Sequence, residues 1–303
     1  VISKYESQFF AIETGSDVQA DIISGRTINR DIYAHVDSKI LKLTNDFKHW
    51  DFYLSPLPVE FVYPTGPSRY ALRFSDAVLF FEEGDFSNPF FFGEGYLGSI
   101  ASNGTLVLAT ARIVNNYWIY QITSEGNFVP LIDLGTIGNY ENIRFFEGAF
   151  WLSGNPPLVS TNGFDWQGIE SLPESYVEFE PESDTFFAYD DNFLYKKEKN
   201  GNWTFVSDQI QSYYPIYQWR DGFFVRKIDE KTYLTFDFLE FFEVPLSPDS
   251  RLIVLGDNVF EVSTVFNGEP IGLKYYRQMK IGLDQWNLWP NINIQGLLSS
   301  YCF

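Results

Sequence analysis

The sequence predicts an all-β protein, a single seven-bladed β-propeller of four-stranded antiparallel blades that occupies residues 1–303. Three observations indicate this fold class. Aromatic residues make up 19% of the chain, and such residues favour the half-buried, pleated surface of a sheet. Aromatic residues recur after turns about every 39 residues, and a second set of turns has a similar spacing. A period of this length is typical of propeller blades.

The first repeat is a turn residue followed two to four positions later by an aromatic anchor and then by a short strand. The turn residues are Asp46, Gly84, Gly126, Gly163, Gly201, Asp237 and Gly282. The matching anchors are Trp50, Phe86, Phe128, Trp166, Trp203, Phe241 and Trp286. Successive anchors lie 36, 42, 38, 37, 38 and 45 residues apart. This regularity indicates that one structural unit occurs seven times.

The second repeat lies upstream of the anchors, where a polar turn leads into a run of aromatic and aliphatic residues. Its turns are Asn103-Gly104, Glu147-Gly148, Ser183-Asp184, Asp221-Gly222 and Asp257-Asn258. From Gly104 the steps are 44, 36, 38 and 36 residues. Chance spacing in a chain rich in Phe could imitate one such register, but two registers that agree are stronger evidence.

The two turns divide each unit into four strands. The first strand ends at the polar turn, the second follows it, the third leads to the anchor turn, and the fourth begins at the anchor. Proline follows the anchor in six of the units, at Pro56, Pro89, Pro130, Pro173, Pro245 and Pro290. Because proline is tolerated in sheets mainly at edges and strand ends, we expect the fourth strand to be the outer edge of its blade.

Closure of the ring is predicted from the two ends of the chain. Residues 5–12 match the second strand of the first unit, which then has no first strand on its N-terminal side. Residues 292–303 remain after the last unit and contain apolar Leu297, Leu298 and Tyr301. We therefore expect this C-terminal segment to pair with residues 5–12 and close the ring, which leaves only short protected edges.

Composition excludes several classes of function. Asp and Glu number 40 against 21 Lys and Arg, so the net charge of −19 repels phosphate backbones and disfavours nucleic-acid binding. The sequence contains no run of eighteen apolar residues, so it predicts no insertion into a membrane. No signal peptide is visible, although a cleaved one would leave no trace. The single cysteine, Cys302, predicts a fold held by packing rather than by disulfides.

One segment of the fourth unit has a motif, Ser160-Thr161-Asn162-Gly163-Phe164-Asp165-Trp166. It resembles a shortened Asp-box, the hairpin of sialidase-like propellers, and the related repeats of propellers encoded by bacteriophages and bacteria. In that family the hairpin is structural. The resemblance implies that a polar side chain ties the turn, that Gly163 supplies a positive φ, and that Trp166 packs between blades. It implies a fold and not an activity.

Candidate catalytic and metal-binding residues are sparse. A sialidase-like enzyme needs an arginine cluster, a Tyr-Glu pair and an acidic Asp, and arginines occur near expected first strands at Arg144, Arg220 and Arg251. Asp190-Asp191-Asn192 could supply oxygen ligands to Ca²⁺ but lacks EF-hand spacing. With only His35, His49 and Cys302, zinc sites and nucleophile systems lack parts. We therefore predict no catalytic residue, no metal and no cofactor.

One insertion breaks the repeat in the first blade. About twenty residues, 13–32, separate the expected second and third strands, where other units use a few. Insertions in repeat proteins form loops that often bind partners. The candidate partner-binding residues are Asp17, Asp21, Ile22, Ile23, Arg26 and Arg30. The alternatives are a drifted surface loop and a hinge into a neighbouring subunit.

The function predicted from these features is that of a non-enzymatic structural or interaction module, in particular a bacteriophage virion protein of the tail or capsid. Its partners would be other protein subunits, either copies of the same chain or virion components. The alternatives are a carbohydrate-binding propeller and a sialidase-like glycoside hydrolase. Localisation in the virion follows from the first interpretation, and an extracellular or cell-surface location with a bound glycan follows from the alternatives.

Overall fold

The computed structural model of this chain is all-β in the residues that it describes. These are residues 6–10, 33–37, 39–44, 51–66, 69–172, 177–182, 185–189, 193–198, 201–208, 210, 216–219, 222–227, 231–244, 251–255, 258–265 and 273–280.

The described strands form seven antiparallel sheets. The first contains β2 (Tyr33–Asp37), β3 (Ile40–Thr44) and β4 (Asp51–Leu54). The second contains β5 (Phe61–Gly66), β6 (Arg69–Phe74), β7 (Ala77–Glu82), β8 (Asp85–Phe86) and β9 (Phe90–Phe91). The third contains β10 (Tyr96–Ser102), β11 (Val107–Ile113), β12 (Asn116–Ile122) and β13 (Phe128–Gly135).

Four strands also form each later sheet. The fourth contains β14 (Ile143–Phe146), β15 (Ala149–Leu152), β16 (Leu158–Ser160) and β17 (Gln167–Gly168). The fifth contains β18 (Glu178–Glu182), β19 (Thr185–Tyr189), β20 (Leu194–Glu198) and β21 (Thr204–Ser207). The sixth contains β22 (Tyr217–Trp219), β23 (Gly222–Arg226), β24 (Thr232–Thr235) and β25 (Phe242–Val244). The seventh contains β26 (Arg251–Leu255), β27 (Asn258–Val265), β28 (Leu273–Lys280) and β1 (Glu6–Phe10).

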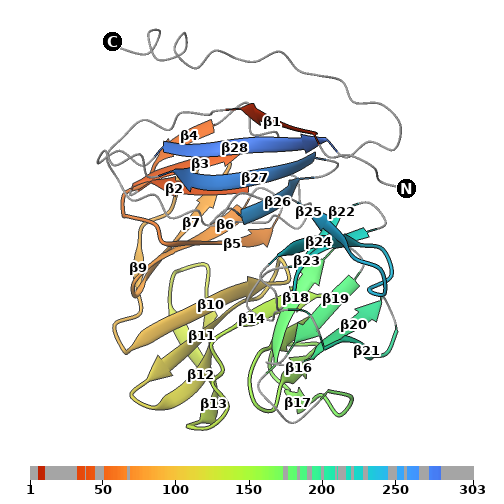
Figure 1. The fold of residues 1–303 in the computed structure, drawn as a ribbon. Helices are drawn as coiled ribbons and strands as arrows, with labels where there is room; N and C mark the ends of the chain where they lie inside the picture. Colours follow the sequence, from red (N-terminus) through yellow and green to blue (C-terminus); the bar gives the residue numbers. More distant parts are fainter. Residues whose placement is uncertain are drawn as a thin grey trace, which may run out of the picture.

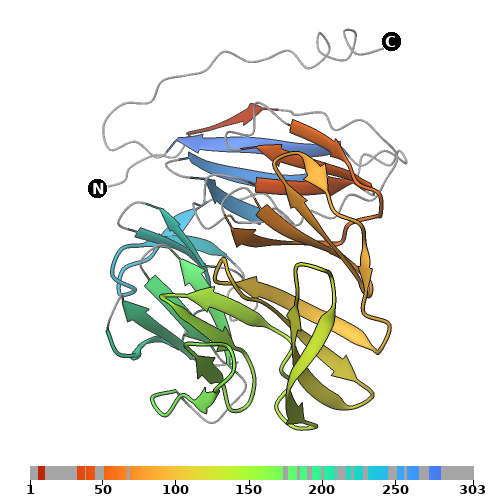
Figure 2. The ribbon, with the colours of Figure 1, turned by 180° about the vertical axis from the view of Figure 1, so that it is seen from behind.

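The sheets follow one another around the molecule in chain order (Figures 1 and 2). In Figure 1 they run from β2–β4 at upper left, down through β10–β13, and up through β18–β21 to β26–β28 at the top. The first strands of successive sheets meet on the inside, where β10 contacts both β5 and β14. This is the radial arrangement of propeller blades.

The strand order predicted within each unit is confirmed in the third to sixth sheets. In the third sheet, for example, β10 ends at Ser102, the polar turn follows, and the anchor Phe128 opens β13. The turn is tied by Asn103, whose Oδ1 accepts hydrogen bonds from the backbone N–H groups of Thr105 at 2.9 Å and Leu106 at 2.7 Å. Pro130 lies in β13, the outer edge strand, as the position of the prolines predicts.

Among the described residues, five buried hydrophobic clusters each join two consecutive sheets. Strand β19 shows how, because successive side chains of a strand point to opposite faces. Phe186 packs on Trp151 of the fourth sheet with ring centroids 4.9 Å apart, whereas Phe187 packs on Phe223 of the sixth sheet at 5.2 Å. Both are fully buried. The second to fifth sheets are therefore each covered on both faces by their neighbours.

The anchors share one role in these clusters. Phe86, Phe128, Trp166, Trp203 and Phe241 each pack against the cluster that joins their own sheet to the preceding one. The repeat in the sequence therefore records one inter-sheet contact per unit. The anchors Trp50 and Trp286 lie outside the described residues.

The prediction for residues 5–12 is wrong. These residues do not form the second strand of the first sheet, because β1 pairs with β28 of the seventh sheet in a register that places Glu6 opposite Lys280 and Phe10 opposite Tyr276. A strand has two edges, and β27 occupies the other edge of β28, so both edges of β28 are paired. The segment 292–303, assigned to closure, lies outside the described residues.

This pairing also changes which strands residues 13–32 connect. They do not join two strands of the first blade, because the strand before them belongs to the seventh sheet and the strand after them to the first. They are a connection between the last sheet and the first. Residues 13–32 themselves lie outside the described part of the chain.

The hairpin at residues 160–166 has the geometry that its motif implies. Asn162 Oδ1 accepts hydrogen bonds from the backbone N–H groups of Phe164 at 2.8 Å and Asp165 at 2.9 Å, and Ser160 Oγ accepts one from Gly163 at 2.8 Å. Gly163 has a φ of 82°, and a Cβ there would lie 2.5 Å from Leu106 Cδ2. Glycine at this position avoids both the strain of a positive φ and the contact with Leu106.

A second hairpin, at residues 235–241 of the sixth sheet, repeats that geometry. Asp237 Oδ1 accepts hydrogen bonds from the N–H groups of Leu239 at 2.8 Å and Glu240 at 3.0 Å, and Thr235 Oγ1 accepts one from Phe238 at 2.8 Å. Phe238 takes the place of the glycine with a φ of 60°. The same turn geometry therefore occurs in the fourth and sixth sheets with different residues.

Asp237 gives a test of this turn. The N–H groups of Glu240 and Leu239 hold the pKa of Asp237 below its ordinary value. The carboxylate therefore stabilises the fold above its unfolded pKa of about 3.9, and this contribution is lost as the pH falls through the lower folded pKa. We expect Asp237→Ala to lower the melting temperature at pH 7 and Asp237→Asn to retain most of it, because the amide keeps an acceptor.

The control is the pH dependence of melting. The difference in melting temperature between the wild type and Asp237→Asn should change as the pH falls from 6 toward 3. A constant difference over that range would show that the carboxylate makes no charge-dependent contribution.

Candidate functional site

The candidate functional site lies at one end of the second and third sheets. At this end the first strand of each sheet begins and the second strand ends. In two neighbouring sheets an aromatic residue that opens the first strand is paired with an arginine on the second. Phe61 of β5 lies opposite Arg73 of β6, and Tyr96 of β10 lies opposite Arg112 of β11. The repeat of the fold thus places the same kind of pair side by side on adjacent sheets.

The guanidinium of Arg73 joins the two pairs. Its Cζ lies 4.1 Å from the ring centroid of Phe61 and 5.5 Å from that of Tyr96, within the range of cation–π attraction. Arg73 is 3% exposed, and its Nη1 donates to the backbone oxygen of Leu97. The rings remain accessible, with Phe61 40% and Tyr96 48% exposed. The buried cation therefore lies beneath exposed aromatic surface.

Tyr63 lies two residues further along β5 and brings a hydroxyl to the same place. Its Oη donates to the backbone oxygen of Gly98 in β10 at 3.5 Å. Burial raises the pKa of Tyr63, and the charges of Arg73 and Arg144 oppose that rise. Arg144 comes from β14 of the fourth sheet, and its Nη1 donates to the backbone oxygen of Ile143, which also accepts a hydrogen bond from Ser99 Oγ of β10 at 3.5 Å. Groups from three sheets therefore meet along the start of β10.

We call this set the arginine–aromatic cluster, and its members are Phe61, Tyr63, Arg73, Tyr96, Arg112 and Arg144. Arg112 forms an exposed ion pair with Glu141 at 3.3 Å. Among the described residues, no carboxylate lies within ion-pair distance of Arg73 or Arg144. The cluster therefore contains two guanidiniums without a carboxylate at ion-pair distance, in a chain whose net charge is −19.

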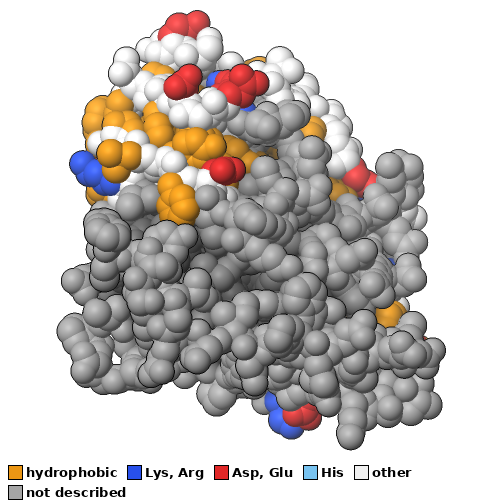
Figure 3. Space-filling view, turned by 90° about the horizontal axis from the view of Figure 1, so that it is seen from above, with side chains coloured by type: hydrophobic (Ala, Val, Ile, Leu, Met, Phe, Trp, Pro, Cys, Tyr) orange, Lys and Arg blue, Asp and Glu red, His pale blue; other side chains and the backbone are white. Residues whose placement is uncertain are grey.

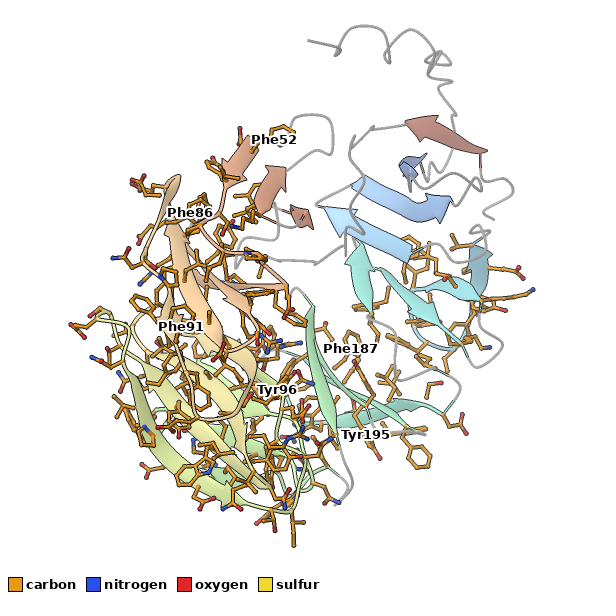
Figure 4. All side chains as sticks on the ribbon, turned by 90° about the vertical axis from the view of Figure 1, so that its left-hand side faces the viewer. Phe52, Phe86, Phe91, Tyr96, Phe187 and Tyr195 are labelled. Carbon is orange, nitrogen blue, oxygen red and sulfur yellow. The ribbon has the colours of Figure 1, made fainter. Side chains whose placement is uncertain are left out.

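A second set of exposed apolar side chains lies on the outer strands of the first two sheets. Phe52 and Leu54 of β4 and Phe91 of β9 are all largely exposed. Figure 4 places Phe52, Phe86 and Phe91 along the outer flank, whereas Tyr96 lies deeper toward the middle of the view. Viewed from above, hydrophobic side chains gather on one part of the surface (Figure 3).

The site residues predicted from sequence fall mostly outside the described residues. This holds for the partner-binding candidates Asp17, Asp21, Ile22, Ile23, Arg26 and Arg30, and for Arg220, His49 and Asp190-Asp191-Asn192. His35 lies in β2, and Arg251 opens β26. Of the arginines proposed near first strands, Arg144 is the one that the structure places in a described cluster. Its Nη1 also donates to the backbone oxygen of Ile143 at 3.3 Å.

Sequence reasoning missed the pairs Phe61/Arg73 and Tyr96/Arg112. The signal was an aromatic at the start of one strand and an arginine near the end of the next, separated by 12 and 16 residues respectively. The separations differ because the turns differ in length, so the pairs become equivalent only when the strand register is known. Within the described residues, no group of three or more His, Cys, Asp or Glu is arranged to hold a metal ion. That part of the chain also contains no helix able to span a membrane.

The buried position of Arg73 gives a prediction for stability. Arg73→Met preserves much of the apolar volume but leaves the Leu97 carbonyl without its donor, and an unsatisfied buried group costs about 1–3 kcal/mol. Arg112→Met is the matched control, because it removes an exposed ion pair of about 0–1 kcal/mol. Urea unfolding should show the larger loss for Arg73→Met. Equal losses would contradict the structural role of Arg73.

Comparison with protein-family models and with curated proteins finds no match to this sequence. Solved structures do match. The WD40 beta propeller domain of Doa1 has a TM-score of 0.57 at 10% identity, covering 92% of this chain and 98% of that one. The AfRom2 CNH domain has a TM-score of 0.56 at 10% identity, covering 92% of this chain and all of that one. Hsv2 of Kluyveromyces lactis has a TM-score of 0.55 at 8% identity, covering 86% and 98%. At these identities the likeness concerns the fold alone, and that fold is propeller-like.

Proposed function

We propose that this chain is a non-enzymatic β-propeller of seven blades that binds other proteins through the end of the sheets that carries the arginine–aromatic cluster. The observation that carries the proposal is the pair of exposed rings, Phe61 and Tyr96, held in place by a buried guanidinium. Protein interfaces are enriched in aromatic residues and arginine. Rings that are already fixed lose little freedom when a partner binds.

The number of blades and the closure of the ring are the more specific part of the proposal. Seven described sheets follow in chain order, and β1 is hydrogen-bonded to the last sheet while its chain continues into the first. We propose that this N-terminal strand closes a ring of seven blades. Closure would hold the first strands of neighbouring sheets at fixed spacing, and the cluster depends on that spacing because three sheets contribute to it.

Two predictions from the sequence remain hypotheses. Bacteriophage origin and a place in the virion derive from the resemblance of residues 160–166 to phage-type repeats. Partner binding by residues 13–32, through Ile22, Ile23, Arg26 and Arg30, derives from the length of that connection. Both concern the partner, and neither is needed for the cluster to act as a binding surface.

Site-specific photocrosslinking tests the binding surface. A benzoylphenylalanine would replace Tyr96 in one variant and Phe164 in the other. Both side chains are about half exposed, at 48% and 50%. They lie at opposite ends of their sheets, because Tyr96 opens a first strand and Phe164 lies in a turn between third and fourth strands.

In extracts of the source organism, the variant at Tyr96 should yield a discrete protein adduct that the variant at Phe164 does not. Adducts of equal yield at both positions, adducts to glycan alone, or no adduct at Tyr96 would each contradict the proposed function. Adducts to glycan alone would favour the carbohydrate-binding alternative.

A further inference from the structure

Two cations in the cluster have no anionic partner among the described residues. Arg112 is paired with Glu141, whereas Arg144 donates to the backbone oxygen of Ile143, and Arg73 donates to the backbone oxygen of Leu97 and interacts with the hydroxyl of Tyr63. The Nε of Arg73 is buried and makes no hydrogen bond in the described structure. A buried guanidinium without a carboxylate is costly, so its retention needs a reason.

The two arginines act at one place although they come from different sheets. Arg73 donates to the backbone oxygen of Leu97 in β10, and Arg144 donates to the backbone oxygen of Ile143, which also accepts a hydrogen bond from Ser99 Oγ of β10 at 3.5 Å. Both guanidiniums are therefore held beside the first strand of the third sheet, which lies between the second and the fourth. Arg144 is half-buried and thus reachable, whereas Arg73 lies beneath the rings of Phe61 and Tyr96. An anion that reached Arg144 would be held by direct contact there and by the field of Arg73 from behind.

The charge of the whole chain limits which anions fit. At −19 the molecule repels polyanions at a distance, so nucleic acids and polyphosphates are disfavoured. A short segment with one or two carboxylates suffers less repulsion. The exposed rings of Phe61 and Tyr96 offer apolar contact to the residues beside such a carboxylate.

We infer that the arginine–aromatic cluster binds a carboxylate of an acidic peptide segment in a protein partner, with Arg144 as the direct contact. Apolar residues next to the carboxylate pack on Phe61 and Tyr96. This inference rests on the proposed function and names the chemistry of the partner. Guanidinium and carboxylate form charge-assisted hydrogen bonds, which are stronger than neutral ones.

Selection from a displayed library of random peptides on the full-length protein tests the inference. We expect enriched sequences to carry Asp or Glu next to apolar residues. Selected peptides would then be labelled with fluorescein and measured by anisotropy, together with versions in which Asn and Gln replace Asp and Glu. The acidic peptides should bind, the amide versions should bind at least about tenfold more weakly, and raising the salt concentration should weaken the acidic ones.

Variants separate the site from general electrostatics. Arg144→Gln should lower affinity about tenfold, and Arg144→Lys should restore part of it. Arg69→Gln is the matched control, because Arg69 opens β6 at the opposite end of that strand and faces Glu82 at 3.5 Å. It removes the same charge from the chain and should leave affinity unchanged. The melting temperature of each variant verifies that it is folded.

Three outcomes would overturn the inference: a selection without acidic enrichment, amide peptides that bind as well as acidic ones, or equal losses for Arg144→Gln and Arg69→Gln. A protein adduct at position 96 together with any of these outcomes would leave the proposed function intact and would contradict only the inference that the partner supplies a carboxylate. Absence of that adduct would contradict the proposed function itself.

Discussion

Packing between consecutive sheets is the contact on which the rest of this structure depends. A sheet with two apolar faces has no stable form alone, and here the second to fifth sheets each bury both faces against their neighbours. The five described anchors all serve this contact in the same direction, toward the preceding sheet. Stability therefore comes from a series of equivalent interfaces, as in other repeat proteins.

The cluster is a consequence of that packing. Arg73 of the second sheet donates to Leu97 of the third, and Tyr63 of the second donates to Gly98 of the third. These groups bond across the junction between sheets at the end where the hydrophobic cluster stops. The junction holds the rings of Phe61 and Tyr96 in place, so a binding surface needs no additional framework. Loops that differ between blades can vary the partner without altering the junction.

The sequence predicted the period, the strand order and the anchors, because each unit needs one bulky ring at the same inter-sheet contact. It failed for β1, because residues 5–12 carry no pattern that selects one partner strand, and the partner lies about 270 residues away. It predicted a turn at Asp237 before the anchor Phe241, but not that this turn shares the geometry of residues 160–166, because Phe238 stands where the motif has glycine. The cluster could not be predicted, since Phe61/Arg73 and Tyr96/Arg112 are equivalent only in the folded register.

The pairing of β1 with β28 gives the most direct test of the proposed ring, because closure of that ring depends on this pairing. Phe9 lies opposite Arg277, so Phe9→Cys with Arg277→Cys in a Cys302→Ser background should form a disulfide under mild oxidation. Ser7→Cys with Arg277→Cys is out of register by two residues, about 7 Å along the strand, and should not. Mass spectrometry of the oxidised chains should find the bridge in the first variant alone, together with a raised melting temperature. No bridge in the first variant, or equal bridging in both, would contradict closure by the N-terminal strand.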